Sequence, residues 1–227
     1  MSYGITMRKR LHVLLGDVVS SRKIGDREKF QRKLSETCKK LNSMYAEDIY
    51  SDFKILKGID EIGGVLSTMA SIHEIITTIL DQLYPESVRF VLALDYVDTA
   101  LETMDVARMD GPAFHRASGM MSRLKKTKLM FDLSVDDEVI DAAVAGQINS
   151  ILLLKGDWSA RQHQVVREYE KTKNQYEVAK NLGITQQAVS KTLNRSKWKQ
   201  IRDIEEKLEH LLHGYAKTRT GGNASGD

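Results

Sequence analysis

The sequence predicts an α+β domain, a sheet packed with helices, over residues 1–154, followed by an all-α helix-turn-helix domain over residues 155–215. The first observation is that strand-like and helix-like segments follow the order β, α, β, β, α, β, α, β, α along residues 1–154. The second is that residues 158–213 carry only helical patterns and short turns. The third is uneven charge: residues 1–154 hold 20 Lys and Arg against 22 Asp and Glu, whereas residues 155–227 hold 14 against 9. The basic excess of the last third indicates a module that binds a polyanion.

The composition excludes several classes of protein. Of the 227 residues, 41% are hydrophobic, 29% are charged and only 2 are proline, which excludes a disordered chain or a loop-dominated scaffold. Cys38 is the single cysteine, and spacings typical of metal-binding cysteines or histidines are absent, which favours a reducing cytoplasm. The longest strongly apolar runs are far shorter than the roughly 18 to 20 residues of a membrane helix. We therefore expect a soluble, cytoplasmic protein that does not enter a membrane.

The first elements each have a local signal. Residues 11–19 form a short apolar run that ends in a turn-prone segment, which predicts a strand. Residues 26–45 place apolar side chains every three or four positions and predict an amphipathic helix. Strand-like segments at residues 49–58 and 62–66 have glycines at the turn between them, which predicts a β-hairpin with Asp60 and Glu61 at its tip.

The remaining elements of this domain are bounded by capping and breaking residues. Pro85 stops a helix, Pro112 is tolerated in the first turn of another, and Ser134 forms a capping box with Asp137. We predict, in order, a helix, a central strand, a helix, a strand and a helix at residues 66–83, 88–98, 110–124, 127–133 and 134–154. This order predicts a sheet covered by helices on one face.

The strongest motif spans residues 175–194, where the pattern is typical of a helix-turn-helix. Ala179 is small where two helices must touch, and Gly183 can adopt the left-handed conformation that ends the first helix. Thr185 is placed to cap the second helix. Ile184 and Val189 are the expected core residues.

A second helix that starts near Gln186 presents amide, hydroxyl and cationic side chains to solvent, and these types read base edges in the major groove of double-stranded DNA. The predicted DNA-binding residues are Thr185, Gln186, Gln187, Ser190, Lys191, Asn194, Arg195 and Lys197. The early residues of the helix are expected at the bases, and the later cations, from Arg195 to Lys199, at phosphates. The alternative is a helical hairpin whose polar face is only solvated.

A last helical stripe favours association of two copies. Its apolar residues, Ile201, Ile204, Leu208, Leu211 and Tyr215, follow a three-four spacing over two heptads. The helix either pairs with a second copy or only closes the DNA-binding domain. We expect a homo-oligomer, most simply a dimer, because helix-turn-helix proteins commonly use two half-sites. Residues 216–227 are small and polar, which predicts a disordered tail.

Three further segments resemble the SatD-like family. They are Gly-Asp-Val-Val-Ser-Ser-Arg-Lys-Ile at residues 16–24, Lys-Gly-Ile-Asp-Glu at residues 57–61 and Asp-Gly-Pro-Ala-Phe-His-Arg-Ala at residues 110–117. The resemblance covers nearly the whole chain, including the approach to the helix-turn-helix at Trp158. It implies a ferredoxin-like or cyclase-like palm with a βαββαβ core, similar to the class III nucleotide cyclases.

In that palm, aspartates on the first strand and in the hairpin hold two metal ions around a nucleoside triphosphate. The resemblance therefore implies Mg²⁺ or a nucleotide near Asp17, with Asp60 as the candidate second ligand; carboxylates on adjacent strand ends can share Mg²⁺. Glu61 and His115 complete the candidate ligand or metal site. Ile59 stands between Gly58 and Asp60, where cyclases have Gly and Asp adjacent, and one extra residue alters the strand register unless a bulge absorbs it.

Cyclases also use an asparagine and, four residues later, an arginine on the helix that follows. Here His115 and Gly119 stand at those positions. Without the arginine, charge developing on phosphate lacks its main donor, so we expect a degenerate site and assign no catalytic residue. The plainer alternatives are that Asp17 caps a turn and that Asp60 and Glu61 are solvated hairpin charges.

These observations predict a sequence-specific DNA-binding transcription regulator. Its first domain would sense a small-molecule effector or mediate assembly, and its second would bind DNA. Two alternatives stay open. One is a metal-dependent nucleotide cyclase or nucleotidyl transferase with a DNA-binding appendage, and the other is an adaptor whose helix-turn-helix binds protein.

Overall fold

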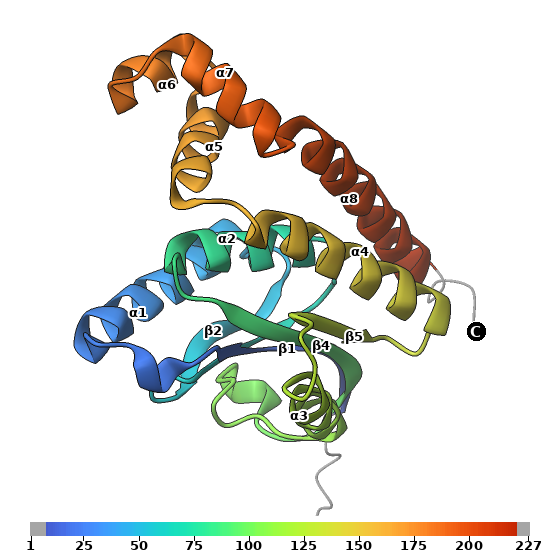
Figure 1. Cartoon of the computed structure of the whole chain (residues 1–227). Coiled ribbons are helices and arrows are strands. Elements are labelled where there is room, and N and C mark those ends of the chain that lie inside the picture. The colour runs from blue at the N-terminus through green and yellow to red at the C-terminus, as the bar shows by residue number, and fades with distance from the viewer. Residues whose placement is uncertain (1–7, 222–227) are drawn as a thin grey trace, which may run out of the picture. The chain divides into compact units, whose positions relative to one another are not determined.

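The computed structural model describes residues 8–221, and residues 1–7 and 222–227 lie outside the described residues. Strands and helices alternate through the first two-thirds of the chain and helices fill the rest (Figure 1). Their bounds are β1 (Lys9–Val18), the 3₁₀ helix η1 (Ser21–Lys23), α1 (Arg27–Met44), β2 (Ile49–Lys57), β3 (Glu61–Leu66), α2 (Ile72–Leu83), β4 (Val88–Val97), the 3₁₀ helix η2 (Leu101–Thr103), α3 (Pro112–Leu124), β5 (Phe131–Ser134), α4 (Glu138–Gly156), α5 (Ala160–Thr172), α6 (Gln175–Leu182), α7 (Gln186–Arg195) and α8 (Trp198–Gly221).

One five-stranded sheet has the order β2-β3-β1-β4-β5. β1 is antiparallel to both β3 and β4, β2 is antiparallel to β3, and β5 is parallel to β4. This register sets Asp17, near the end of β1, opposite Glu61 of β3 on one side and Arg89 of β4 on the other. Strands and helices follow the predicted order, and the α+β class is confirmed.

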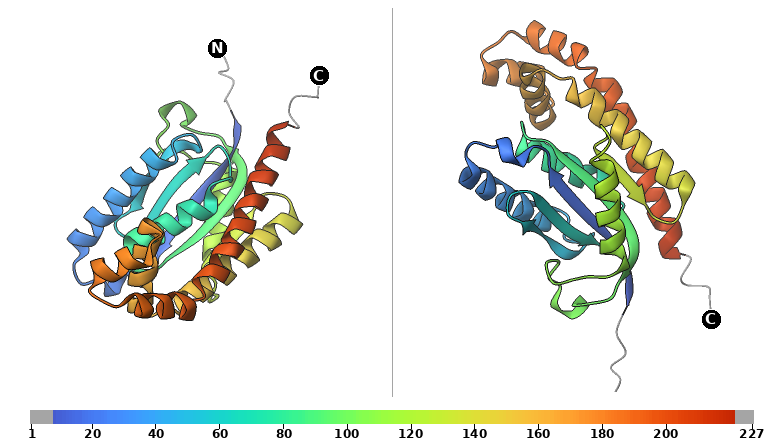
Figure 2. Two further views of the ribbon diagram at one scale, coloured as in Figure 1. Left: turned by 90° about the horizontal axis from the view of Figure 1, so that it is seen from above. Right: turned by 60° about the horizontal axis from the view of Figure 1, so that its bottom comes forward.

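Helices cover both faces of the sheet. Figures 1 and 2 show α1 and α2 on one face and α3 on the other. The prediction that helices cover one face alone is therefore wrong. The reason lies in the parallel pair β4 and β5, which requires a crossover connection, and α3 lies in this connection and packs on β1 and β4.

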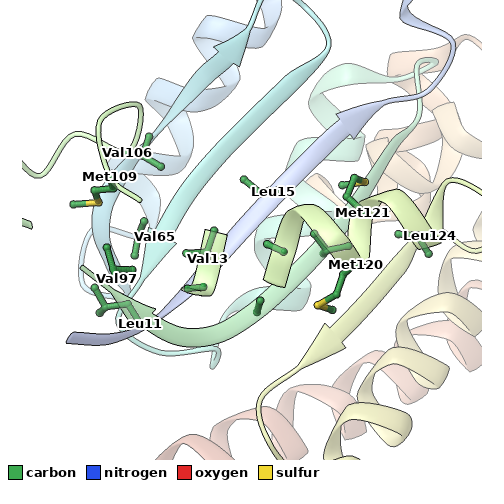
Figure 3. Close-up of a cluster of buried hydrophobic side chains, with 14 of the residues drawn as sticks. Leu11, Val13, Leu15, Val65, Val97, Val106, Met109, Met120, Met121 and Leu124 are labelled. Carbon is green, nitrogen blue, oxygen red and sulfur yellow. The ribbon is translucent and has the colours of Figure 1, made fainter. Parts of the chain in front are cut away.

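The core beneath α3 fixes where that helix ends. Figure 3 shows buried side chains of β1 facing those of α3, among them Leu11, Val13, Leu15, Met120, Met121 and Leu124. Each such side chain contributes about 1.5 to 3 kcal/mol when it leaves water. Lys125 is the C-cap residue of α3, so this packing holds the backbone of Lys125 in place relative to the sheet.

The chain divides into two compact units, one of residues 1–146 with 209–227 and one of residues 147–208. The division falls inside α4 and inside α8, whereas the sequence analysis places domain boundaries at 154 and 215. These predicted boundaries stay a prediction. α8 continues to Gly221, so residues 216–221 are helical where a disordered tail was expected, and the rest of that tail lies outside the described residues.

The second unit contains a small helical core. α5, α6 and α7 bury an apolar cluster made of Val165, Val166, Val178, Ala179, Val189 and Leu193. Two tryptophans pack against this cluster, and hydrogen bonds fix their indole N–H groups. Trp158 donates to the carbonyl oxygen of Ser196 at 2.9 Å, and Trp198 donates to Glu170 at 3.2 Å. Val189 therefore occupies the core position predicted for it, whereas Ile184 is only partly buried and packs against the cluster. Ala179 is buried in the cluster.

By length and composition alone, α4 could cross a membrane, because it carries an 18-residue window of mean hydropathy 1.3. The sequence analysis missed it, because short polar residues interrupt its apolar runs. A single helix of this kind is weak evidence for a membrane span. The cytoplasmic location stays a prediction.

Gly111 has a backbone conformation that a side chain would oppose. Its φ is +145°, and a Cβ atom there would lie 2.9 Å from the backbone nitrogen of Asp98 and 2.9 Å from the carbonyl oxygen of Tyr96. We expect Gly111→Ala to lower the free energy of unfolding by about 2 to 3 kcal/mol. Gly146→Ala is the control, since a Cβ atom added there would meet nothing within 4 Å and an alanine favours the helix. Thermal unfolding of both variants checks this, and equal effects would contradict it.

His12 makes the stability of the first unit depend on pH. Burial lowers the pKa of its imidazole from 6.5 to about 4, and Arg10 acts in the same direction. The unfolded state therefore binds this proton more readily than the native state. The contribution of the neutral imidazole to the free energy of unfolding is fully present above pH 6.5. As the pH falls towards 4, up to about 3 kcal/mol of this free energy is lost. We expect the free energy of unfolding, measured by urea titration at several pH values between 6.5 and 4, to fall less for His12→Gln than for the wild type. An equal fall in both proteins would exclude the effect.

Candidate functional site

The turn between α6 and α7 is built from residues suited to it. Asn174 caps α6 by accepting hydrogen bonds from the backbone N–H groups of Tyr176 and Glu177. Gly183 has φ of +63°, the left-handed region in which glycine is least strained, and ends α6. Thr185 then caps α7 by accepting from the N–H of Ala188 at 3.2 Å. The capping role predicted for Thr185 is thus observed.

One face of α7 gathers polar side chains around a shallow hollow of about 510 Å³. It is lined by Gln186, Gln187, Ser190, Lys191, Asn194 and Arg195. These are six of the eight residues that the sequence analysis assigns to DNA. Gln186 also donates a hydrogen bond of 2.6 Å to Gln175 on α6, which restrains its amide. The other two, Thr185 and Lys197, are exposed but do not line the hollow.

The carboxylates and the α7 cations of the second unit differ in whether they have ion-pair partners. Glu205 is buried and pairs with Lys155 at 2.6 Å and with Arg202 at 3.5 Å. Glu168 similarly accepts from Lys171 and Asn181. By contrast, no ion pair among the described residues joins a carboxylate to the cations of α7 and of the four residues that follow it, which are Lys191, Arg195, Lys197 and Lys199. The face of α7 therefore carries uncompensated positive charge.

A second polar site lies in the first unit, where β1 ends beside the β2-β3 turn. A cavity of about 500 Å³ there is lined by Asp17, Val18, Ser20, Ser21, Arg22, Lys23, Lys57, Asp60, Glu61 and Lys125. The N–H of Val18 donates to the carbonyl oxygen of Asp60 at 2.8 Å, which fixes the turn against β1. The three carboxylates predicted as ligands, Asp17, Asp60 and Glu61, therefore line one cavity.

Ile59 lies in the turn without disturbing this arrangement. Ile59 is only 3% exposed, so its side chain is part of the core. Gly58 has φ of +54°, and the N–H of Asp60 donates to the carbonyl oxygen of Lys57 at 2.9 Å. The turn therefore accommodates Ile59, and β3 starts at Glu61.

Cations surround the carboxylates of this cavity. Asp17 accepts from Lys125 Nζ at 2.6 Å, and Arg89 Nη1 lies 3.7 Å from its other carboxylate oxygen. Burial raises the pKa of Glu61, an effect that Lys125 opposes and the negative charge of Asp17 reinforces. Within the described residues, Asp60 Oδ1 is buried without a hydrogen-bond partner.

This arrangement does not fit the metal ions that the family resemblance implies. Over residues 8–221, no group of three or more His, Cys, Asp or Glu side chains is placed to hold a metal ion. The Lys125 ammonium already contacts the carboxylate that would be the first ligand. A divalent ion at Asp17 would face this ammonium at close range, and like charges repel strongly in a partly buried site.

The remaining candidate, His115, lies apart from the cavity. Its Nε2 is 3.2 Å from Asp110 Oδ1 and its side chain is 73% exposed. The neighbouring Arg116 pairs with Asp95 at 2.7 Å and with Asp136 at 2.6 Å, and it does not line the cavity. His115 does not line the cavity that holds the three carboxylates, because α3 places its first turn away from the cavity and its last turn beside it. A ligand role for His115 stays a prediction.

Sequence reasoning missed Lys57 and Lys125 as site residues. The only local signal for Lys125 is the basic run at residues 125–128, and such a run is ordinarily a solvated surface. Only the packing of α3 on the sheet shows that Lys125 approaches Asp17.

The fold and the two sites define a class: an α+β unit with a charged cavity, followed in the chain by a helical unit with a cationic polar face. A family model matches most of the chain. The SatD family model matches residues 12–210, and the chain belongs to the SatD family. No curated protein matches the chain.

The cap of α7 gives a direct test of how this face is positioned. Thr185→Ala removes the oxygen that accepts from Ala188, and we expect a loss of about 1 kcal/mol in the stability of the helical unit. Thr185→Ser keeps this oxygen and should retain most of the stability. Urea unfolding followed by tryptophan fluorescence measures the difference; indistinguishable midpoints would show that the cap does not matter.

Proposed function

We propose that this protein is a sequence-specific DNA-binding transcription regulator, in which α6 and α7 form a helix-turn-helix and α7 is the recognition helix. The observation that carries the proposal is the face of α7, where six amide, hydroxyl and cationic side chains line one hollow without a carboxylate. The core of a protein-binding surface is generally enriched in aromatic side chains and methionine and depleted in lysine. A surface of amides and unpaired cations instead suits nucleic acid.

The chemistry of this face fits the major groove of double-stranded DNA. Gln and Asn can pair with adenine through two hydrogen bonds, and Arg and Lys can pair with guanine. Gln186 and Gln187 occupy the first turn of α7, which approaches base edges most closely in proteins of this kind. Asn194 and Arg195 lie two turns further along.

Cations next to the recognition helix supply the part of binding that does not depend on sequence. Lys197 and Lys199 follow α7 directly, are exposed, and have no ion pair with a carboxylate among the described residues. Each phosphate contact releases a counterion and adds about one unit to the salt dependence of binding. The unit 147–208 holds twelve Lys and Arg against seven Asp and Glu, and this excess is consistent with polyanion binding.

For the first unit, we propose a ferredoxin-like or cyclase-like palm that senses an effector or mediates assembly. The antiparallel order β2-β3-β1-β4 supports this topology, and β5 extends the sheet beyond it. Gly119 at the position of the cyclase arginine favours sensing over catalysis. A homodimer in the cytoplasm that binds two half-sites completes the proposal.

The decisive experiment selects bound sequences from random DNA with the full chain and then measures affinity at two salt concentrations. Gln187→Ala should relax the preference at one base position, at a cost of about 1 to 3 kcal/mol in discrimination. Lys191→Ala should weaken binding and reduce the salt slope by up to about one unit if it contacts phosphate. Lys171→Ala is the matched control, because Glu168 already pairs with this cation, and it should bind as the wild type does.

Two outcomes contradict the proposal. Selection that yields no enriched sequence would exclude sequence-specific recognition. In that case the adaptor hypothesis, in which the helix-turn-helix binds protein, would take its place. Enrichment that survives both α7 substitutions unchanged would remove α7 from the DNA interface and would refute its assignment as the recognition helix.

A further inference from the structure

The cavity at the end of β1 is unused by DNA recognition, and its charges are mixed. Four cationic and three carboxylate side chains line it, together with two serines. We propose that this cavity binds a small organic phosphate that carries hydroxyl or amino groups, and that Lys125 serves there as a resident cation in place of a divalent metal ion.

The first step concerns Asp17. Its carboxylate is contacted by Lys125 at 2.6 Å and faces Arg89 at 3.7 Å, and its side chain is only 13% exposed. Both oxygens thus already have a cationic neighbour supplied by the protein. A ligand that needs a metal ion as a bridge to Asp17 would have to displace an ion pair, whereas a metal-free ligand meets the Lys125 ammonium directly.

The second step concerns the cations that remain. Arg22, Lys23 and Lys57 line the same cavity, and no ion pair joins them to a carboxylate in the part of the chain that the structure describes. Arginine and lysine bind phosphate through charge-assisted hydrogen bonds, which are about twice as strong as neutral ones. An anion of this kind would balance the cations that Asp17 does not neutralise.

The third step concerns Asp60, which explains why the ligand must also donate. Oδ1 of Asp60 is buried without a hydrogen-bond partner in residues 8–221. An unsatisfied buried acceptor is energetically unfavourable, and a hydroxyl or amino group of the ligand would supply the missing donor. Inorganic phosphate alone would balance the cations but would not supply the donor for Asp60. A cavity of about 500 Å³ accommodates a metabolite of this size.

This inference goes beyond the proposed function, and the two can fail separately. DNA binding is tested on α7, whereas the ligand is tested by calorimetry without DNA. A protein that binds the phosphate but no DNA would refute the regulator alone.

The experiment titrates the full chain with ribose 5-phosphate and with AMP, first in EDTA and then in excess Mg²⁺. Ribose and adenosine are the matched probes without phosphate. We expect at least one phosphate to bind with similar affinity in both buffers and the neutral probes to give no heat. The probe that binds more tightly shows whether the ligand is a sugar phosphate or a nucleotide.

Variants then assign the binding to the cavity. Lys125→Met should lower the affinity for the phosphate probe by about tenfold or more, which is the loss expected for one charged hydrogen bond. Lys126→Met is the matched control, because that neighbour is exposed and does not line the cavity. Lys125→Arg keeps the charge and should retain binding, which separates loss of the cation from loss of folding.

The proposal is overturned if neither phosphate binds, or if binding requires Mg²⁺ and disappears in EDTA. It is also overturned if Lys125→Met binds as tightly as the wild type or if Lys126→Met weakens binding equally.

Discussion

The pairing of β1 with two antiparallel neighbours is the constraint on which the first unit depends. β1 pairs with β4 along its whole length and with β3 from His12 to Asp17, and its central residues are buried on both faces. A shift of one residue would turn every apolar side chain of β1 to the opposite face, so packing on both sides fixes the register. The same register brings the end of β1 to the β2-β3 turn, and the charged cavity exists because these two backbone segments meet there.

Much of the fold could be predicted because periodicity is a local property. The polar face of α7 followed directly from helical spacing once Thr185 set the start of the helix. The side of the sheet that α3 covers could not be predicted in this way, since it depends on β5 pairing parallel to β4 across the long segment of chain between Val97 and Phe131. The length of α8 was missed because its last turns lack apolar periodicity.

The candidate sites show the same division between local and distant information. The hairpin pattern placed Asp60 and Glu61 at a turn, and the family resemblance joined them with Asp17 in one candidate site. The turn around Ile59 keeps the three carboxylates together. Lys125 follows a different helix, and no local pattern places it beside Asp17. His115 is only ten residues from Lys125, yet most of α3 separates them, so one of them lies at the cavity and the other does not.

The two tryptophans of the chain, Trp158 and Trp198, both belong to the helical unit and share its apolar cluster with α5, α6 and α7. Their indole N–H groups are held by Ser196 and Glu170, so their environment changes when that cluster opens. Tryptophan fluorescence, excited at a wavelength that tyrosine does not absorb, therefore reports on the helical unit alone. Circular dichroism reports on the secondary structure of both units. Comparison of the two signals during denaturation distinguishes a concerted transition from sequential unfolding, and no label has to be attached.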